Sequence, residues 1–276
     1  MSTNAKRWCF TGVTFLLALV ILFPVINVFF TSLKPATEFF TTDFSLVPKQ
    51  LTTQWYEEIL YTTPIVRNIF NSFAVSFGTM LVNLVVVTMG AYALSRYTFP
   101  MKQVMSASII FAYVFPAILL VLPLYMIIAG LGLTNNYFGL IITHTTFTIP
   151  YGIFLLRSYM DTIPKSIDES AIIDGAGAIR TFLSVIIPLS APGIAAILTY
   201  ALINSWNEYL YSSVIMTKQV MKTLPVKISE FISEMSEIRW GTVMAAACIA
   251  LLPSSILFQF LQKEFINGLT AGAVKG

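Results

Sequence analysis

Charged residues are scarce in this 276-residue chain. Asp, Glu, Lys and Arg make up 11% of the sequence, whereas 57% of the residues are hydrophobic. Soluble globular domains carry roughly 25% charged residues, so the composition excludes most soluble proteins. The net charge of +3 is also far below the basic excess with which nucleic-acid-binding proteins neutralise phosphates. We therefore expect a protein surrounded by membrane lipid, with no nucleic-acid partner.

Residues that carry catalytic or metal chemistry are equally scarce. The sequence has one histidine, His144, and two cysteines, Cys9 and Cys248, which cannot form a disulfide framework or a zinc site. It lacks the glycine-rich phosphate-binding loop of nucleotide-hydrolysing enzymes and the His-Glu-x-x-His pattern of zinc hydrolases. No nucleophile with a nearby base is evident. These absences argue against an enzyme, against ATP binding of that kind and against a bound metal.

Long segments without charge mark the expected membrane spans, because a charge at the bilayer centre costs roughly 2.5 kcal/mol or more. Four such segments fit one helix of about 20 residues each, and the 54-residue segment 103–156 fits two that turn at 130–136. We therefore expect an all-α polytopic membrane protein, with a single transmembrane domain over 1–276. Its six transmembrane helices are expected at about 9–32, 69–94, 105–128, 137–157, 181–204 and 241–262.

The distribution of Lys and Arg predicts the orientation. Six spans put both termini on one side, where the segments carry nine basic and five acidic residues. The opposite loops, roughly 34–67 and 208–239, are longer and hold the other seven basic and eight acidic residues. Short loops rich in Lys and Arg remain in the cytoplasm. We therefore expect both termini to be cytoplasmic.

The segment between the fourth and fifth expected spans has the composition of a short surface helix. Ser166 and Glu169 have the spacing of a capping box, and Gly175 supplies a position where a helix can end. We expect a helix of about two turns within 164–176 at the cytoplasmic surface. One face of it would be buried, while Asp168 and Glu169 would be available to a cation of a partner.

From residue 169 to residue 192 the sequence resembles the EAA loop of ATP-binding cassette (ABC) importer permeases, especially the sugar-importer branch that includes the maltose permeases. The matching positions are Glu169, Ala171, Asp174, Gly175, Ala176, Phe182, Pro188 and Pro192. One position departs from the pattern: Ser170 replaces the first alanine of Glu-Ala-Ala, which exchanges one small residue for another. The similarity extends to four other segments, 31–35, 90–96, 206–210 and the tail 268–276.

This resemblance implies a type I ABC importer permease fold in a prokaryotic inner membrane, with a cytoplasmic coupling helix at about 164–176. It further implies three kinds of partner: a second permease subunit in a heterodimer, two ATP-binding subunits, and an extracytoplasmic solute-binding protein that delivers a sugar or glycoside. ATP and Mg²⁺ would then be held by the partners, and this chain would bind no cofactor and catalyse no reaction. Coupling to the ATP-binding subunits would fall to Glu169, Ala171, Asp174 and Gly175.

A second candidate site lies at the outer end of the fifth expected span. Sugar sites combine aromatic faces with amides and carboxylates, because an unpaired buried polar group is costly. Residues 204–211 have this mixture, and we hypothesise that Asn204, Trp206, Asn207 and Tyr209 border the substrate pathway. An aromatic belt at the membrane surface with capping amides is an alternative interpretation of the same residues.

The alternative function is an ion-coupled secondary carrier of a small polar solute. Such a carrier would need no ATPase, but it would need titratable or ion-coordinating residues within its spans. The sequence offers only His144 and scattered Ser and Thr for this role. His144 itself has two interpretations, either a proton relay or ligand, or a side chain that is hydrogen-bonded to a neighbouring helix.

Overall fold

The computed structural model describes residues 3–39, 45–233 and 240–273, and every regular element among them is helical. The expected all-α class is therefore confirmed. The Cys9 side chain and the side chains of the tail 268–276 lie outside the described residues. The α-helices are α1 (Thr3–Thr31), α2 (Gln54–Thr62), α3 (Ile65–Arg96), α4 (Lys102–Val114), α5 (Val121–Gly130), α6 (Tyr137–Met160), α7 (Lys165–Ile173), α8 (Ala178–Thr181), α9 (Ile187–Leu189), α10 (Ala191–Trp206), α11 (Leu210–Ile215), α12 (Leu224–Ser233) and α13 (Trp240–Ala273).

Four short elements complete the helical structure. Three are 3-10 helices, and the fourth is a π-helix that joins α8 to α9; they lie at Ala36–Glu38, Ala117–Leu120, Gln219–Met221 and Phe182–Ile186.

Three helices of the described chain are long and apolar enough to cross a membrane: the Phe10–Thr31 part of α1, α3 and α6. Two further stretches pass the same test only as bent pairs. The α4 helix meets Ala117–Gly130 at 95°, and Ala178–Leu189 meets α10 at 78°. The segments where we expected the third and fifth spans are therefore broken helices.

Proline explains the position of the first break. Pro116 follows Phe115, whose backbone is extended, and α4 ends just before at Val114. A proline disfavours helical backbone in the residue before it and has no N–H to donate, so a helix ends there unless neighbours compensate. Pro192 lies in the first turn of α10, where the missing N–H would have had no partner within the helix.

Contacts divide the chain into two compact units, of which unit 1 comprises Met1–Ile65 and Lys227–Leu252. In unit 1 the Trp55 indole donates a hydrogen bond to the Lys34 carbonyl at 2.7 Å. The same indole lies so close to Gly241 that a Cβ there would come within 2.2 Å of the ring. Only glycine allows the start of α13 to approach α2 this closely.

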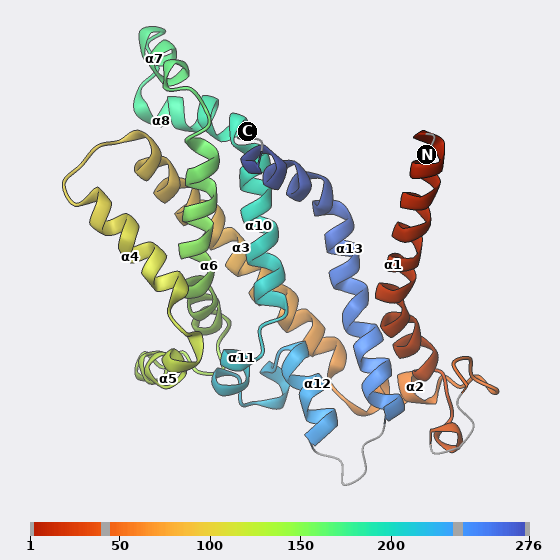
Figure 1. The fold of residues 1–276 in the computed structure, drawn as a ribbon. Coiled ribbons are helices and arrows are strands. Elements are labelled where there is room, and N and C mark those ends of the chain that lie inside the picture. The colour runs from red at the N-terminus through yellow and green to blue at the C-terminus, as the bar shows by residue number, and fades with distance from the viewer. Residues whose placement is uncertain (1–2, 40–44, 234–239, 274–276) are drawn as a thin grey trace. The chain divides into compact units, whose positions relative to one another are not determined.

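Unit 2 comprises Val66–Val226 and Pro253–Gly276 and contains both candidate sites. Its α6 helix packs against α4 and α10, and α11 packs against α5 and α6. Within this unit α7 and α8 lie at one end, whereas α5 and α11 lie at the opposite end (Figure 1). One cluster of buried residues joins α3, α6 and α10, and a second joins α3, α5, α6 and α11.

Hydroxyl side chains inside unit 2 bond within their own helices. The Thr143 hydroxyl donates to the Gly139 carbonyl at 2.8 Å, and the Thr199 hydroxyl donates to the Ala195 carbonyl at 2.7 Å. Both threonines are buried. A hydroxyl that bonds the carbonyl four residues earlier is satisfied without a second helix, so these polar groups fit an apolar surrounding.

Candidate functional site

The helix α7 lies where the sequence predicted a short helix, but it begins differently. Pro164 precedes it as the N-cap residue, and no side-chain hydrogen bond caps this end. The expected capping box between Ser166 and Glu169 is therefore wrong, because Ser166 already lies inside the helix, whereas the box requires the serine at the N-cap. The fixed φ of proline sets the start instead.

Gly175 ends α7, as the sequence predicted. Its φ of 83° lies in the left-handed region that favours glycine. The Gly175 N–H donates to the Ile172 carbonyl at 3.0 Å, and the Ala176 N–H donates to the Ala171 carbonyl at 2.9 Å. This pair of bonds is the Schellman arrangement, which satisfies carbonyls at the end of a helix and turns the chain sharply.

The proposed coupling residues lie on the surface of α7 and the turn that follows it. Glu169, Asp174 and Gly175 are exposed, and Ala171 is half-buried. The adjoining apolar side chains are also exposed: Ile172 by 61% and Ile173 by 84%.

Asp168 pairs within the chain, although we expected it to be available to a partner. Its Oδ2 lies 3.0 Å from the Nε of Arg96, and the two side chains are only 14% and 6% exposed. The same guanidinium donates to the carbonyls of Met160 at 3.2 Å and Ile163 at 3.1 Å. Arg96 and Met160 are the last residues of α3 and α6, so one side chain connects the ends of these helices to α7.

The sequence analysis gave Arg96 no role. A signal was nevertheless present, because Arg96 ends a long apolar segment on the same predicted side of the membrane as the acidic residues of 164–176. Neighbouring Ser95 adds a second link, since its hydroxyl donates to Asp161 Oδ1 at 2.6 Å.

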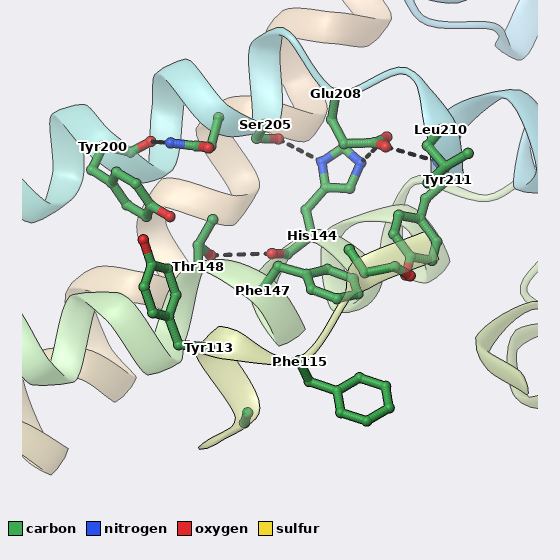
Figure 2. Close-up of a pocket in the computed structure, with 13 residues that line it drawn as sticks. Tyr113, Phe115, His144, Phe147, Thr148, Tyr200, Ser205, Glu208, Leu210 and Tyr211 are labelled. Carbon is green, nitrogen blue, oxygen red and sulfur yellow. Dashed lines mark hydrogen bonds and ion pairs between the residues drawn. The ribbon is translucent and has the colours of Figure 1, made fainter. Parts of the chain in front are cut away.

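A cavity of about 280 Å³ lies in unit 2, near the end formed by α5 and α11. Its lining consists of residues from the end of α4, from the break that follows it, and from α6, α10, α11 and the turn between α10 and α11 (Figure 2). Its lining residues are Ala112, Tyr113, Phe115, Ala117, His144, Phe147, Thr148, Tyr200, Asn204, Ser205, Glu208, Leu210 and Tyr211.

His144 is the centre of a hydrogen-bond network at this cavity. Its Nδ1 lies 2.7 Å from the Ser205 hydroxyl of α10, and its Nε2 lies 3.0 Å from Glu208 Oε2. The Ser205 hydroxyl also lies 3.3 Å from the Thr79 hydroxyl of α3. The interpretation of His144 as a side chain bonded to a neighbouring helix is therefore confirmed.

Glu208 follows the end of α10, and its carboxylate accepts several further hydrogen bonds. The backbone N–H of Tyr211 donates to Oε1 at 2.7 Å, and the N–H and hydroxyl of Ser212 donate to Oε2 at 2.9 and 2.8 Å. Burial raises the pKa of Glu208, but the hydrogen bonds and charge of His144 and the bonds from Tyr211 and Ser212 outweigh it and lower the pKa below its ordinary value.

The structure brings one of the four proposed pathway residues to the cavity. Asn204 lines it, whereas Trp206, Asn207 and Tyr209 are absent from the lining. Trp206 is buried in the protein with 4% of its surface exposed, and Asn207 and Tyr209 are exposed. Asn204 lies one turn after Tyr200, which also lines the cavity, whereas Asn207 and Tyr209 follow the end of α10.

Glu208 was not predicted as a site residue, although it is the one carboxylate in the stretch 204–211. Among the described residues no group of three or more His, Cys, Asp and Glu side chains is placed to hold a metal ion. The cavity is therefore best described as an aromatic pocket with one imidazole–carboxylate pair.

Comparison with known protein families gives a match over most of unit 2 and beyond. Residues 86–269 match the family described as the binding-protein-dependent transport system inner membrane component. The inner membrane ABC transporter permease protein YcjP of Escherichia coli (strain K12) is 36% identical, and the alignment covers 100% of both chains.

Two further relatives carry the names of particular solutes. The trehalose/maltose transport system permease protein MalG of Thermococcus litoralis is 33% identical over 95% of this chain and 94% of its own length. The sulfoquinovosyl glycerol transport system permease protein SmoH of Agrobacterium fabrum is 31% identical over 92% of this chain and 89% of its own length.

Solved structures show the same fold. A chain of a bacterial ABC transporter that imports the acidic polysaccharide alginate matches with a TM-score of 0.82 and 24% identity, over 96% of this chain and 99% of that chain. A chain of the same kind of transporter, solved with a periplasmic protein bound to an alginate pentasaccharide, matches with a TM-score of 0.67 and 13% identity, over 94% of each chain.

Proposed function

Since this chain belongs to the family of binding-protein-dependent transport system inner membrane components, we propose that it transports a sugar or glycoside as one permease subunit of an ATP-driven importer. It is a multi-pass inner membrane protein of the ABC importer permease fold. Several full-length relatives named for sugar uptake support the solute class, including those named for trehalose/maltose, trehalose and galactooligosaccharides.

The proposed importer contains four kinds of subunit. A second, different permease completes the pathway, two ATP-binding subunits hold and hydrolyse ATP with Mg²⁺, and an extracytoplasmic binding protein delivers the solute. This chain then needs no cofactor of its own. The charge distribution supports an orientation with both termini and α7 in the cytoplasm, on the side where ATP is available.

The observation that carries the proposal is the construction of α7. Glu169, Ala171, Asp174 and Gly175 form the proposed coupling surface, and exposed isoleucines adjoin them. Carboxylates next to exposed apolar side chains suit a protein partner that supplies cations around an apolar contact. Because Arg96 connects α7 to the ends of α3 and α6, movement of a bound ATPase would be transmitted to these helices.

The proposed pathway follows the segment after α10. Asn204 faces the cavity, Asn207 and Tyr209 lie exposed beyond it, and Trp206 holds the segment in the protein core. Asn204, Asn207 and Tyr209 would border the route of the solute or the docked binding protein, and Trp206 would support them from the core.

The coupling role of Glu169 can be tested with the purified complex in proteoliposomes. We expect Glu169→Ala to reduce solute-stimulated ATP hydrolysis and uptake by about tenfold or more, because it removes a charged contact at the interface. Ser170→Ala is the matched control, since it changes the adjacent exposed residue to the alanine of the family pattern and should retain both activities. Equal activity of Glu169→Ala and Ser170→Ala would contradict the coupling role.

The same preparation discriminates the ion-coupled carrier. Uptake should require ATP inside the vesicles together with the binding protein, and it should persist when ion gradients are collapsed. Uptake driven by an ion gradient in vesicles that contain this chain without ATP-binding subunits would overturn the proposed function.

A further inference from the structure

We infer that the cavity around His144 binds a single sugar ring and selects neutral sugars against acidic ones. This inference rests on the proposed function and goes beyond it, because it names a solute-contacting site in this chain and a class of sugar. Four observations carry it: the size of the cavity, its aromatic walls, its hydrogen-bonding groups and the sign of its charge.

The cavity is small for an oligosaccharide. Its volume of about 280 Å³ lies just below the roughly 300–1,000 Å³ of pockets that hold drug-sized molecules. It therefore suits one ring at a time, with the rest of a longer solute outside.

Aromatic side chains form two walls of the cavity. Tyr113 and Tyr200 lie on one side, and Phe147 and Tyr211 lie on the other, with His144 between them (Figure 2). The Phe147 and Tyr211 rings support each other, with their centroids 4.8 Å apart. The apolar faces of aromatic rings match the C–H faces of a sugar ring, so a ring packed against either wall buries apolar surface.

The polar groups of the lining divide into two kinds. The Glu208 carboxylate already accepts bonds from His144, Tyr211 and Ser212, so it contributes charge more than free hydrogen-bonding capacity. Asn204 donates from Nδ2 to the Tyr200 carbonyl, and its Oδ1 is bonded to no described residue. The Tyr211 hydroxyl already donates to the Ala117 carbonyl. The Asn204 oxygen and the hydroxyls of Tyr113 and Tyr200 are therefore the groups suited to the hydroxyl groups of a sugar.

The charge of the lining opposes an acidic sugar. Glu208 is the one carboxylate among the lining residues, and none of them is Lys or Arg. His144 cannot replace a missing cation, because Nε2 faces Glu208 and Nδ1 faces Ser205. With Glu208 ionised, the imidazole–carboxylate pair supplies no net positive charge to the cavity. A carboxylate or sulfonate on the solute would lose its water in this cavity without gaining a positive partner.

Two proteins of the comparison are named for acidic solutes, sulfoquinovosyl glycerol and alginate, although this chain shares their family or fold. The inference therefore expects a neutral solute for this chain, which differs in charge from the solutes in those two names.

The test measures sugar binding directly, by saturation-transfer NMR on the complex purified through a tag on this chain. The probes are methyl α-glucoside, methyl α-galactoside and methyl α-mannoside, each paired with the uronic acid that has the same ring. We expect at least one neutral glycoside to bind and its uronic acid to bind about tenfold more weakly or not at all. Absence of binding by all three neutral glycosides, or equal binding of each acid, would overturn the inference.

Three variants assign the binding to this cavity. Phe147→Ala should weaken binding of the neutral glycoside about tenfold, which corresponds to 1.4 kcal/mol. Phe154→Ala is the matched control, because Phe154 lies two turns further along α6, is 51% exposed and does not line the cavity. Glu208→Gln, which keeps an accepting oxygen, should reduce the preference against the uronic acid. Thermal melting of each variant shows whether it is folded.

Equal effects of Phe147→Ala and Phe154→Ala in folded complexes would place the binding elsewhere and overturn the inference. The outcome is separable from the proposed function, because NMR binding needs no ATP. ATP-dependent uptake together with no effect of Phe147→Ala on binding would support the proposed function and contradict the proposed binding site. Absence of ATP-dependent uptake of any sugar would contradict the proposed function itself.

Discussion

The ion pair between Arg96 and Asp168 predicts a large effect of a single substitution on the docking of α7. Arg96→Ala removes the guanidinium and leaves the Asp168 carboxylate, which is 14% exposed, without its cation. Removing one partner of a buried pair costs about 3–5 kcal/mol, because the remaining charge stays desolvated. The carbonyls of Met160 and Ile163 lose a donor at the same time.

The expected result is local opening of α7. A cost of about 3 kcal/mol corresponds to an increase of more than a hundredfold in the opening equilibrium, since 1.4 kcal/mol is tenfold. Hydrogen exchange followed by mass spectrometry on the purified complex measures this equilibrium for the amides of residues 165–173. The Arg96→Ala complex should exchange there at least tenfold faster than the wild type, with little change in the amides of α10.

Arg157→Ala is the matched control. Arg157 also pairs with an aspartate, Asp161, but the distance is 3.7 Å and the side chains are 32% and 46% exposed. Exposed pairs contribute about 0–1 kcal/mol, so the exchange of α7 should change little. The double variant Arg96→Ala/Asp168→Ala should recover part of the protection, because it removes the unpaired charge. Unchanged exchange in Arg96→Ala, or equal exchange in Arg96→Ala and Arg157→Ala, would refute this reasoning.

Three further predictions concern stability, each measured by thermal unfolding of the purified complex. Gly175→Ala should destabilise the turn after α7 by about 1–2 kcal/mol, because its φ of 83° is unfavourable for residues with a Cβ; Gly177→Ala, where the added Cβ meets nothing within 4 Å, should not. Gly193→Ala should cost about 1–3 kcal/mol, because its Cβ would lie 2.8 Å from the ring of Tyr159; a melting temperature equal to the wild type would contradict this packing. The pKa of Glu208 is lower in the folded protein than in the unfolded chain, where it is 4.5. The ionised carboxylate therefore stabilises the fold fully above pH 4.5, and this stabilisation is lost as the pH falls through the folded pKa. The Glu208→Gln protein should therefore lose less stability than the wild type as the pH falls. Identical dependence of the melting temperature on pH in the two proteins would disprove this.

The sequence predicted the features that depend on local chemistry. The scarcity of charge indicated an all-helical membrane protein, and Gly175 marked the end of α7, because one residue type is strongly favoured at φ 83°. The capping box of Ser166 and Glu169 was predicted wrongly, because Pro164 occupies the N-cap position and Ser166 already lies inside α7.

Breaks in the long helices could not be located from proline alone. Pro116 lies at a bend of 95°, whereas Pro150 and Pro253 lie inside continuous helices. The local cost of proline is the same in each case, so packing against neighbouring helices decides whether the chain bends or compensates.

Pairs of residues far apart in the sequence account for what was missed at the candidate site. His144 and Glu208 are 64 positions apart, and Arg96 and Asp168 belong to different helices. Charge spacing along the chain identifies only Arg96 and Glu208, each as the end of an uncharged segment. It carries no information on which ends meet, because that depends on how the helices pack.

The hydroxyls that bond within their own helices bear on how the protein is made. Thr143 and Thr199 carry their hydrogen bonds with them, so each helix can leave the translocon with these groups already satisfied. His144 differs, because Ser205 and Glu208 are synthesised 61 and 64 residues later. The newly inserted α6 therefore holds an unpaired imidazole until α10 arrives, and its association with α10 in the bilayer relieves that cost. The hydrogen-bonding groups of His144 thus favour the association of α6 with α10 in the bilayer.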